Sequence, residues 1–251
     1  MPQRILPIPK DTQKVLEKTS CDNAYLLLNR YLEGENKRGK PFDTTKTKKE
    51  LYSKIQRITF NTEPHKNRFH ATLKKLSASG FKKECFTLKT DSRMVVGLGD
   101  ANALEVGLTL HPLYGFPYIP GSSLKGLCRS WLEIAEDTFE TENGKNILKG
   151  KELKTKIQED SLKVFGSADK DERVRKDLAE VLQESQLGDV TFFDAIPAQN
   201  PSFEIDIMTP HYGEYYQDPA KNPPADWYSP NPIKFLTVAP ETEFVFGLAS
   251  R

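Results

Sequence analysis

The chain has 251 residues, 37% of them hydrophobic, and a formal net charge of +1 at pH 7. This is enough apolar material for a globular core. Cys21, Cys85 and Cys128 lie far apart without CxxC spacing, which argues against a zinc site and a secreted disulfide framework. The N-terminus has no signal-peptide pattern, and no run of about 18 apolar residues predicts a membrane span. We therefore expect a soluble cytoplasmic protein that contacts no membrane and needs no cofactor or metal.

The net charge conceals an asymmetry along the chain. Residues 46–89 carry twelve Lys or Arg against three Glu, whereas residues 184–251 carry three basic against ten acidic side chains. The basic excess favours a polyanion partner such as nucleic acid. A solvated basic helix face would give the same pattern, so this reading remains an alternative.

The first 80 residues predict helices. Residues 12–32 are expected to form one helix, which begins near Asp11 or Thr12 and stops before Gly34. Two basic helices follow, one around 51–58 and one from Pro64 to Gly80. Residues 1–80 are therefore interpreted as a basic helical extension.

From residue 81 the pattern changes to strands, which makes the expected class α+β. Strands are predicted at 81–89 and at 104–110, where apolar residues alternate. A charged, helical insertion is expected at about 140–185. Between the last strands lies a Pro-, Tyr- and Asn-rich loop at 209–232, long enough to suggest a functional or partner-binding role. The other predicted strands correspond to GDVTFFDA, FEIDIM, IKFLTV and TEFVFGL.

The segment YIPGSSLKGLCR, residues 118–129, predicts a loop that leads sharply into a helix. Ser122 or Ser123 can cap this helix, and its first N–H groups would then form a ready anion site. Lys125 and Arg129 are four residues apart and so lie on one helix face. The alternative is an ordinary capped helix with two solvated basic residues. The apolar face of the same helix is predicted from Leu124, Leu127, Cys128, Trp131, Leu132 and Ala135.

This segment resembles the signature I-P-G-S-S-[LI]-[KR]-G-x-x-R of the RAMP superfamily of CRISPR antiviral proteins. Together with VFGS, GDVTFFDAIP and IDIMTPHYGEYY, it is similar to the sixth subunit of type III-B, or Cmr, effector complexes. The resemblance covers roughly residues 93–251. It implies a ferredoxin-like (RRM-like) RAMP core over residues 81–251.

The resemblance also implies a function and a set of contacts. A subunit of this kind binds guide RNA near its 3′ end, meets target RNA through the guide, and contacts the repeated backbone subunit and a neighbouring terminal subunit. Aromatic side chains commonly stack on single-stranded RNA, although those beside proline also serve as loop packing. The RNA-binding residues implied by position are Gly121, Ser122, Ser123, Lys125, Arg129, His211, Tyr212, Tyr215 and Tyr216.

The sequence departs from the family pattern after its last predicted strand. RAMP proteins usually close with a further helix and a glycine-rich loop, which are expected to be lacking here, as in a shortened or split member. Such a sheet would leave Phe244, Val245 and Phe246 in need of cover from a neighbouring polypeptide.

Catalysis is not predicted, so the chain is interpreted as a structural RNA-binding subunit rather than an enzyme. His111 and His211 are conceivable acid–base residues, and Asp100 is the nearest loop carboxylate, but no motif supplies a partner for them. Two alternatives stay open: a RAMP-type endoribonuclease that processes guide RNA, and a protein-only adaptor.

Overall fold

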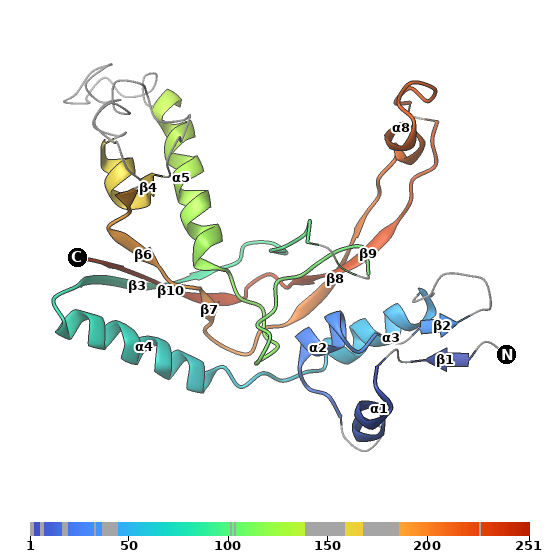
Figure 1. Cartoon of the computed structure of the whole chain (residues 1–251), viewed down its shortest axis with the longest axis horizontal. Helices are drawn as coiled ribbons and strands as arrows, with labels where there is room; N and C mark the ends of the chain where they lie inside the picture. Colours follow the sequence, from blue (N-terminus) through green and yellow to red (C-terminus); the bar gives the residue numbers. More distant parts are fainter. Residues whose placement is uncertain are drawn as a thin grey trace. The chain divides into compact units, whose positions relative to one another are not determined.

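The chain combines helices with antiparallel strands (Figure 1), which confirms the α+β class. The computed structural model describes residues 3–5, 8–16, 20–32, 34–36, 45–100, 102, 104–138, 159–167, 186–225 and 227–251. Two compact units form, each from three stretches of chain: 1–62, 89–118 and 197–243 in unit 1, and 63–88, 119–196 and 244–251 in unit 2. The division at residue 80 remains a prediction. Of the predicted insertion, only 159–167 is described, and 159–165 is helical.

Unit 1 begins with two short helices where the sequence predicted one. The helix restarts at Ala24 because Asn23 has an extended backbone, and its side-chain oxygen accepts the Leu26 N–H at 3.0 Å. The single helix predicted over 12–32 is therefore wrong. The elements of the N-terminal part are β1 (Gln3–Ile5), α1 (Lys10–Leu16), α2 (Ala24–Asn29), β2 (Gly34–Asn36) and α3 (Thr45–Ile55).

The strand predicted at 104–110 is also absent from the described chain, although its apolar residues are buried. Leu104, Val106, Leu108 and Leu110 are each less than 8% exposed. Glu105, however, has a φ of 74°, a left-handed conformation that interrupts a strand. The segment therefore contributes to the core as irregular chain, with a bridge between Leu110 and Pro117 and a hydrogen bond from the Thr109 N–H to the Val96 carbonyl at 2.8 Å.

A long antiparallel arm carries the predicted 209–232 loop. β8 (Phe203–Met208) pairs with β9 (Ile233–Val238) along their whole length. At the tip of the arm the loop forms the short helix α8 (Gly213–Gln217), as Figure 1 shows. Both strands were predicted from the sequence and are confirmed.

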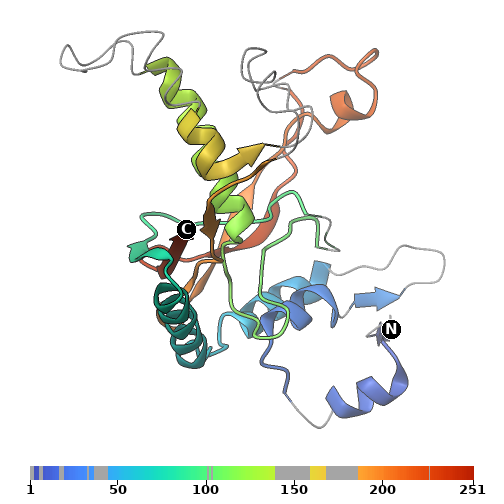
Figure 2. The same cartoon turned by 60° about the vertical axis from the view of Figure 1, so that its left-hand side comes forward.

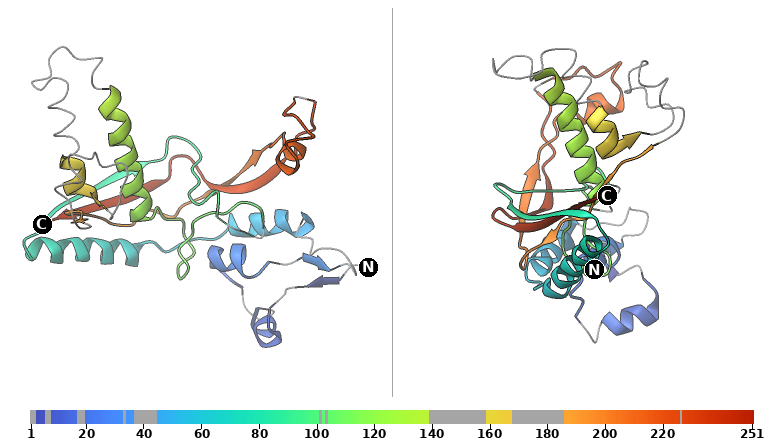
Figure 3. Two further views of the ribbon diagram at one scale, coloured as in Figure 1. Left: turned by 45° about the horizontal axis from the view of Figure 1, so that its top comes forward. Right: turned by 90° about the vertical axis from the view of Figure 1, so that its left-hand side faces the viewer.

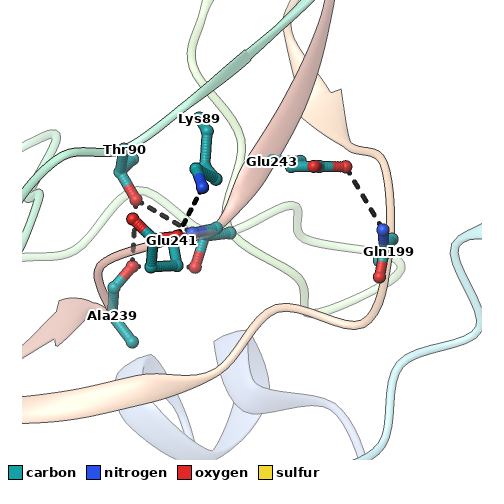
Figure 4. A network of polar contacts seen from close by, with 7 residues as sticks. Lys89, Thr90, Gln199, Ala239, Glu241 and Glu243 are labelled. Atoms are coloured by element: carbon teal, nitrogen blue, oxygen red, sulfur yellow. Dashed lines mark hydrogen bonds and ion pairs between the residues drawn. The ribbon is translucent and has the colours of Figure 1, made fainter.

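The turn between β9 and the last strand, β10 (Glu243–Ser250), is held by side chains (Figure 4). Thr90 donates through its hydroxyl to the Ala239 carbonyl at 3.1 Å and accepts the Thr242 N–H at 3.0 Å. Lys89 is paired with Glu241, and this hydrogen bond raises the pKa of the Lys89 ammonium group. Thr90 thus links both sides of the turn that leads into β10.

Unit 2 is built on an antiparallel sheet of order β3–β10–β6, in which β7 also pairs with β10. α4 packs on one face, where a Cβ on Gly247 would come within 2.6 Å of Phe69 and 3.2 Å of Leu73. Figure 3 shows α4 running along this sheet. The elements are α4 (Glu63–Ala78), β3 (Lys82–Lys89), α5 (Gly121–Thr138), β4 (Gly166–Ser167), β5 (Gln186–Leu187), β6 (Val190–Phe192) and β7 (Ile196–Pro197).

The expected need for an external cover over β10 is met largely within the chain. Phe244 is 1% exposed and Val245 is 4% exposed, so for these residues the expectation is wrong. They are buried because described residues pack on both faces of β10 at this point. Phe246 is half-buried and stacks against Phe86 of β3.

Candidate nucleic-acid interface

The segment that begins α5 is fixed to unit 2 by the backbone. Ile119 forms an antiparallel bridge with Ala195, with N–H to O distances of 3.0 Å and 2.8 Å. Two residues later, the Gly121 N–H donates to Asp194 Oδ1 at 2.7 Å. Figure 2 shows the first turn of α5 beside the sheet, with the rest of the helix running away from it. The start of α5 is therefore held in place, while its length extends outward.

Gly121 is required by how closely the two backbones approach. The residue is buried, and a Cβ added there would clash with the Phe192 carbonyl oxygen and come within 2.9 Å of the Phe192 carbonyl carbon. Neither atom can move without displacing β6. The glycine of the PGSS motif thus lets the helix start directly against a strand.

The cap of α5 differs from the sequence prediction. Neither serine is the cap, because the helix already begins at Gly121 and the Pro120 carbonyl accepts the Ser123 and Leu124 N–H groups at 2.9 Å and 3.1 Å. Asp194 satisfies the Gly121 amide instead. A carboxylate is favourable at a helix N-terminus, so this amide is not available to a phosphate.

Asp194 was missed by the sequence analysis. The signal was present in GDVTFFDAIP, where an acid lies two residues after the strand that the helix start approaches. Its carboxylate is exposed and carries negative charge beside the predicted anion site. Phosphate contacts at this end of α5 would therefore fall to side chains rather than to the first backbone amide.

The polar side chains of the motif lie along the first two turns of α5. Ser122 and Ser123 are exposed, whereas Lys125 and Arg129 are half-buried. Half-burial of the side-chain stems is compatible both with a phosphate contact and with the alternative of two solvated basic groups, so both readings stay open. Half-burial leaves each ammonium or guanidinium group near the protein surface, where it can meet a phosphate.

The apolar face predicted for α5 is only partly buried. Leu124 and Leu132 are half-buried, but Leu127 is 68% exposed and Trp131 is 69% exposed. Cys128 is also exposed. Only the start of α5 lies against the sheet, so the predicted face finds little cover among the described residues of unit 2.

The second predicted set lies in unit 1, at the tip of the β8–β9 arm. Tyr215 and Tyr216 lie on α8 with ring centroids 5.5 Å apart, and Tyr216 is 73% exposed. His211 and Tyr212 precede the helix, with ring centroids 6.4 Å apart. These four residues therefore lie close together at the tip of the arm. The predicted α5 residues belong to unit 2.

Trp227 is a further aromatic residue of this loop that the sequence analysis did not single out. It is 77% exposed, and its ring centroid lies 6.1 Å from that of Tyr228. The signal available was a tryptophan in a loop rich in proline and asparagine. Its exposure makes it as suitable for stacking as the predicted tyrosines.

The residues considered for catalysis lie in different settings. His111 packs among aromatic rings, with centroid distances of 4.6 Å to Tyr114 and 5.5 Å to Phe116, and its Nδ1 accepts the Leu113 N–H at 3.2 Å. His211 is exposed. Asp100 is exposed in a turn, where its N–H donates to the Gly97 carbonyl.

Two features are absent from the part of the chain that the structure describes. The described residues contain no group of three or more His, Cys, Asp or Glu side chains that could hold a metal ion. Within the same part of the chain, no helix has the length and apolar character needed to cross a membrane.

Comparison with known proteins gives consistent relatives. The RAMP superfamily profile matches residues 87–246. The CRISPR system Cmr subunit Cmr6 of Pyrococcus furiosus is 38% identical over 191 residues, which cover 65% of this chain and 56% of that protein. The Cmr6 subunit of Saccharolobus solfataricus is 26% identical over 166 residues, which cover 64% and 43%. The chain therefore spans about half the length of these relatives.

The fold is similar to that of a solved structure. It is a chain of the type III-B Cmr-beta complex bound to cognate target RNA, with a TM-score of 0.54 and 22% sequence identity. The likeness covers 86% of this chain and 64% of that one.

Two glycines of α5 provide a matched test of the close approach to β6. Gly121→Ala should destabilise the protein by roughly 1–3 kcal/mol, because the new methyl group meets backbone that cannot relax. Gly126→Ala should stabilise it by about 1 kcal/mol, because that site is exposed helix with no atom within 4 Å of the added Cβ. Thermal denaturation followed by circular dichroism measures both. Equal melting behaviour of the two variants would contradict the described helix start.

Proposed function

The chain belongs to the RAMP superfamily, and from that premise we propose that it is a non-catalytic structural subunit of a type III-B CRISPR effector complex. In this role it binds guide RNA near the 3′ end and meets target RNA through the guide. Its protein partners would be the repeated backbone subunit and a neighbouring terminal subunit. The proposal includes a cytoplasmic location, as expected for a protein that acts on intracellular RNA.

The fold of unit 2 supports the proposal. A sheet of order β3–β10–β6 with α4 on one face and α5 starting beside β6 is compatible with the ferredoxin-like core proposed here. The expected lack of a closing helix and glycine-rich loop remains a prediction, as does the reading of residues 1–80 as an extension.

The observation that carries the proposal is the start of α5. Gly121 brings the first turn against β6, which leaves Ser122 and Ser123 exposed, with Lys125 and Arg129 on the next turns. Since Asp194 takes the Gly121 amide, we assign phosphate contacts to the two hydroxyls and the two basic groups. Charge-assisted bonds of this kind are the strong contacts to phosphate.

The aromatic loop of unit 1 supplies a second part of the proposed interface. His211, Tyr212, Tyr215 and Tyr216 are assigned to stacking on bases or to phosphate contact. Exposed aromatic rings suit single-stranded RNA because every base offers a face for stacking.

Charge reversal on α5 tests the RNA contact. Lys125→Glu and Arg129→Glu should each weaken binding of single-stranded guide RNA by roughly tenfold, since a hydrogen bond to a charged group contributes about 1.5 kcal/mol. The slope of log affinity against log salt concentration should also become shallower by about one unit per lost phosphate contact. Fluorescence anisotropy over a salt series measures both quantities.

Lys163→Glu is the matched control for this experiment. It changes the net charge equally and lies in the same unit, but its side chain is exposed and lies 3.9 Å from Asp160. If all three variants lose the same affinity, general electrostatics rather than the α5 contact explains the binding. Undiminished affinity in folded α5 variants would remove the start of α5 from the RNA interface, whereas a lack of RNA binding by the unmodified chain would favour the protein-only adaptor.

The absence of catalysis is tested with guide precursor and target RNA. The purified chain should cut neither, with or without divalent metal, because no acid–base pair was predicted around its loop histidines. Gel analysis of labelled RNA measures cleavage. Cleavage that disappears in His111→Ala or His211→Ala would instead establish the endoribonuclease alternative.

A further inference from the structure

A stacked pair of phenylalanines lies at the edge of the sheet in unit 2, away from the start of α5. Phe86 of β3 and Phe246 of β10 have ring centroids 5.4 Å apart and planes inclined by only 5°. We propose that this pair is a second RNA-contact surface, on which a base of single-stranded RNA stacks against Phe86. The choice of RNA as the ligand rests on the proposed function, but the surface is separate from α5.

The direction of the stack leaves one ring face available. Adjacent strands lie about 4.8 Å apart, so rings stacked across two strands have their common axis along the strand-to-strand direction. β3 is the outermost strand of this sheet among the described residues. One face of the Phe86 ring therefore meets Phe246, and the other is directed past the edge of the sheet.

The rest of this sheet face is covered unevenly. Phe192 of β6 is opposite Leu248 of β10 and so lies on the same face as Phe246, and it stacks on Phe165 at 5.9 Å. At the β3 side, Phe86 is 42% exposed and Leu88 is 55% exposed. Among the described residues of this face, the exposed apolar side chains Phe86 and Leu88 lie at the edge that carries the phenylalanine stack.

On the opposite face, α4 packs against β10 at Gly247, whereas Cys85 of β3 is exposed. Cys85 alternates with Phe86 along β3, and its thiol lies 3.9 Å from His70 Nδ1 of α4. Burial raises the pKa of this thiol. The neighbours of Phe86 on its own side of β3 are Glu84 and Leu88.

Charge favours RNA over protein as the occupant. Lys82 and Lys83 at the start of β3 are exposed, and Lys82 lies on the same face of the strand as Phe86 and Glu84. Lysine is depleted in protein–protein interfaces, whereas basic groups beside exposed aromatic rings are the usual features of single-strand RNA sites. The sequence analysis noted a basic excess over residues 46–89 without locating a surface for it.

Substitutions of Phe86 separate base stacking from simple apolar contact. Phe86→Leu keeps an apolar side chain but removes the ring, and it should weaken binding of a fluorescein-labelled, single-stranded guide RNA by about tenfold. Phe86→Tyr keeps the ring and should retain the affinity of the unmodified protein. Leu88→Ala, on the same face of the same strand, is the control and should change RNA affinity less than twofold. Circular dichroism melting verifies that each variant is folded.

The other outcomes contradict the inference in distinguishable ways. Unchanged RNA affinity in folded Phe86→Leu would remove base stacking from this site, and equal losses in Phe86→Leu and Phe86→Tyr would do the same. If Leu88→Ala and Phe86→Leu instead weaken association with a neighbouring subunit, the surface binds protein. If Lys125→Glu weakens RNA binding while Phe86→Leu does not, the proposed function stands and only this second surface is lost.

Discussion

The close approach of two backbones at Gly121 is the constraint on which the start of α5, and with it the proposed interface, depends. The first turn of α5 can lie against β6 only because no Cβ stands between Gly121 and the Phe192 carbonyl. The bridge between Ile119 and Ala195 brings the chain to this point, and Asp194 satisfies the first amide of the helix. The glycine of the motif thus allows α5 to pack directly against β6. This packing in turn sets the positions of the exposed side chains of the motif.

Asp194 changes the electrostatics expected of such a helix start. A free helix N-terminus attracts phosphate through unsatisfied amides and the helix dipole. Here a carboxylate already satisfies the Gly121 amide, so in the proposed interface the attraction of phosphate is assigned to Lys125 and Arg129 further along α5. An interface of this kind is expected to depend strongly on salt, because side-chain charges near the surface are screened more readily than a dehydrated amide pocket.

Much of the fold could be predicted because apolar periodicity is local. α4, α5, β3, β8, β9 and β10 follow the patterns from which they were predicted. The misses arose where a single residue overrode the pattern: Asn23 restarts a helix through its side chain, and Glu105 interrupts an alternating apolar segment through its φ. Periodicity identifies an apolar helix face but does not show whether other residues pack on it. Trp131 lies on the apolar face predicted for α5, yet it is exposed. Asp194 was missed because its contact joins residues 73 positions apart.

An RNA–protein crosslinking map of the assembled effector particle tests the central claim most directly. Ultraviolet crosslinking followed by mass spectrometry identifies the peptides of this chain that touch guide RNA in the complete complex. The account predicts guide crosslinks within residues 118–129, at the start of α5. Protein–protein crosslinks across these residues, with no guide crosslink anywhere in the chain, would contradict it and assign the chain to protein contacts alone.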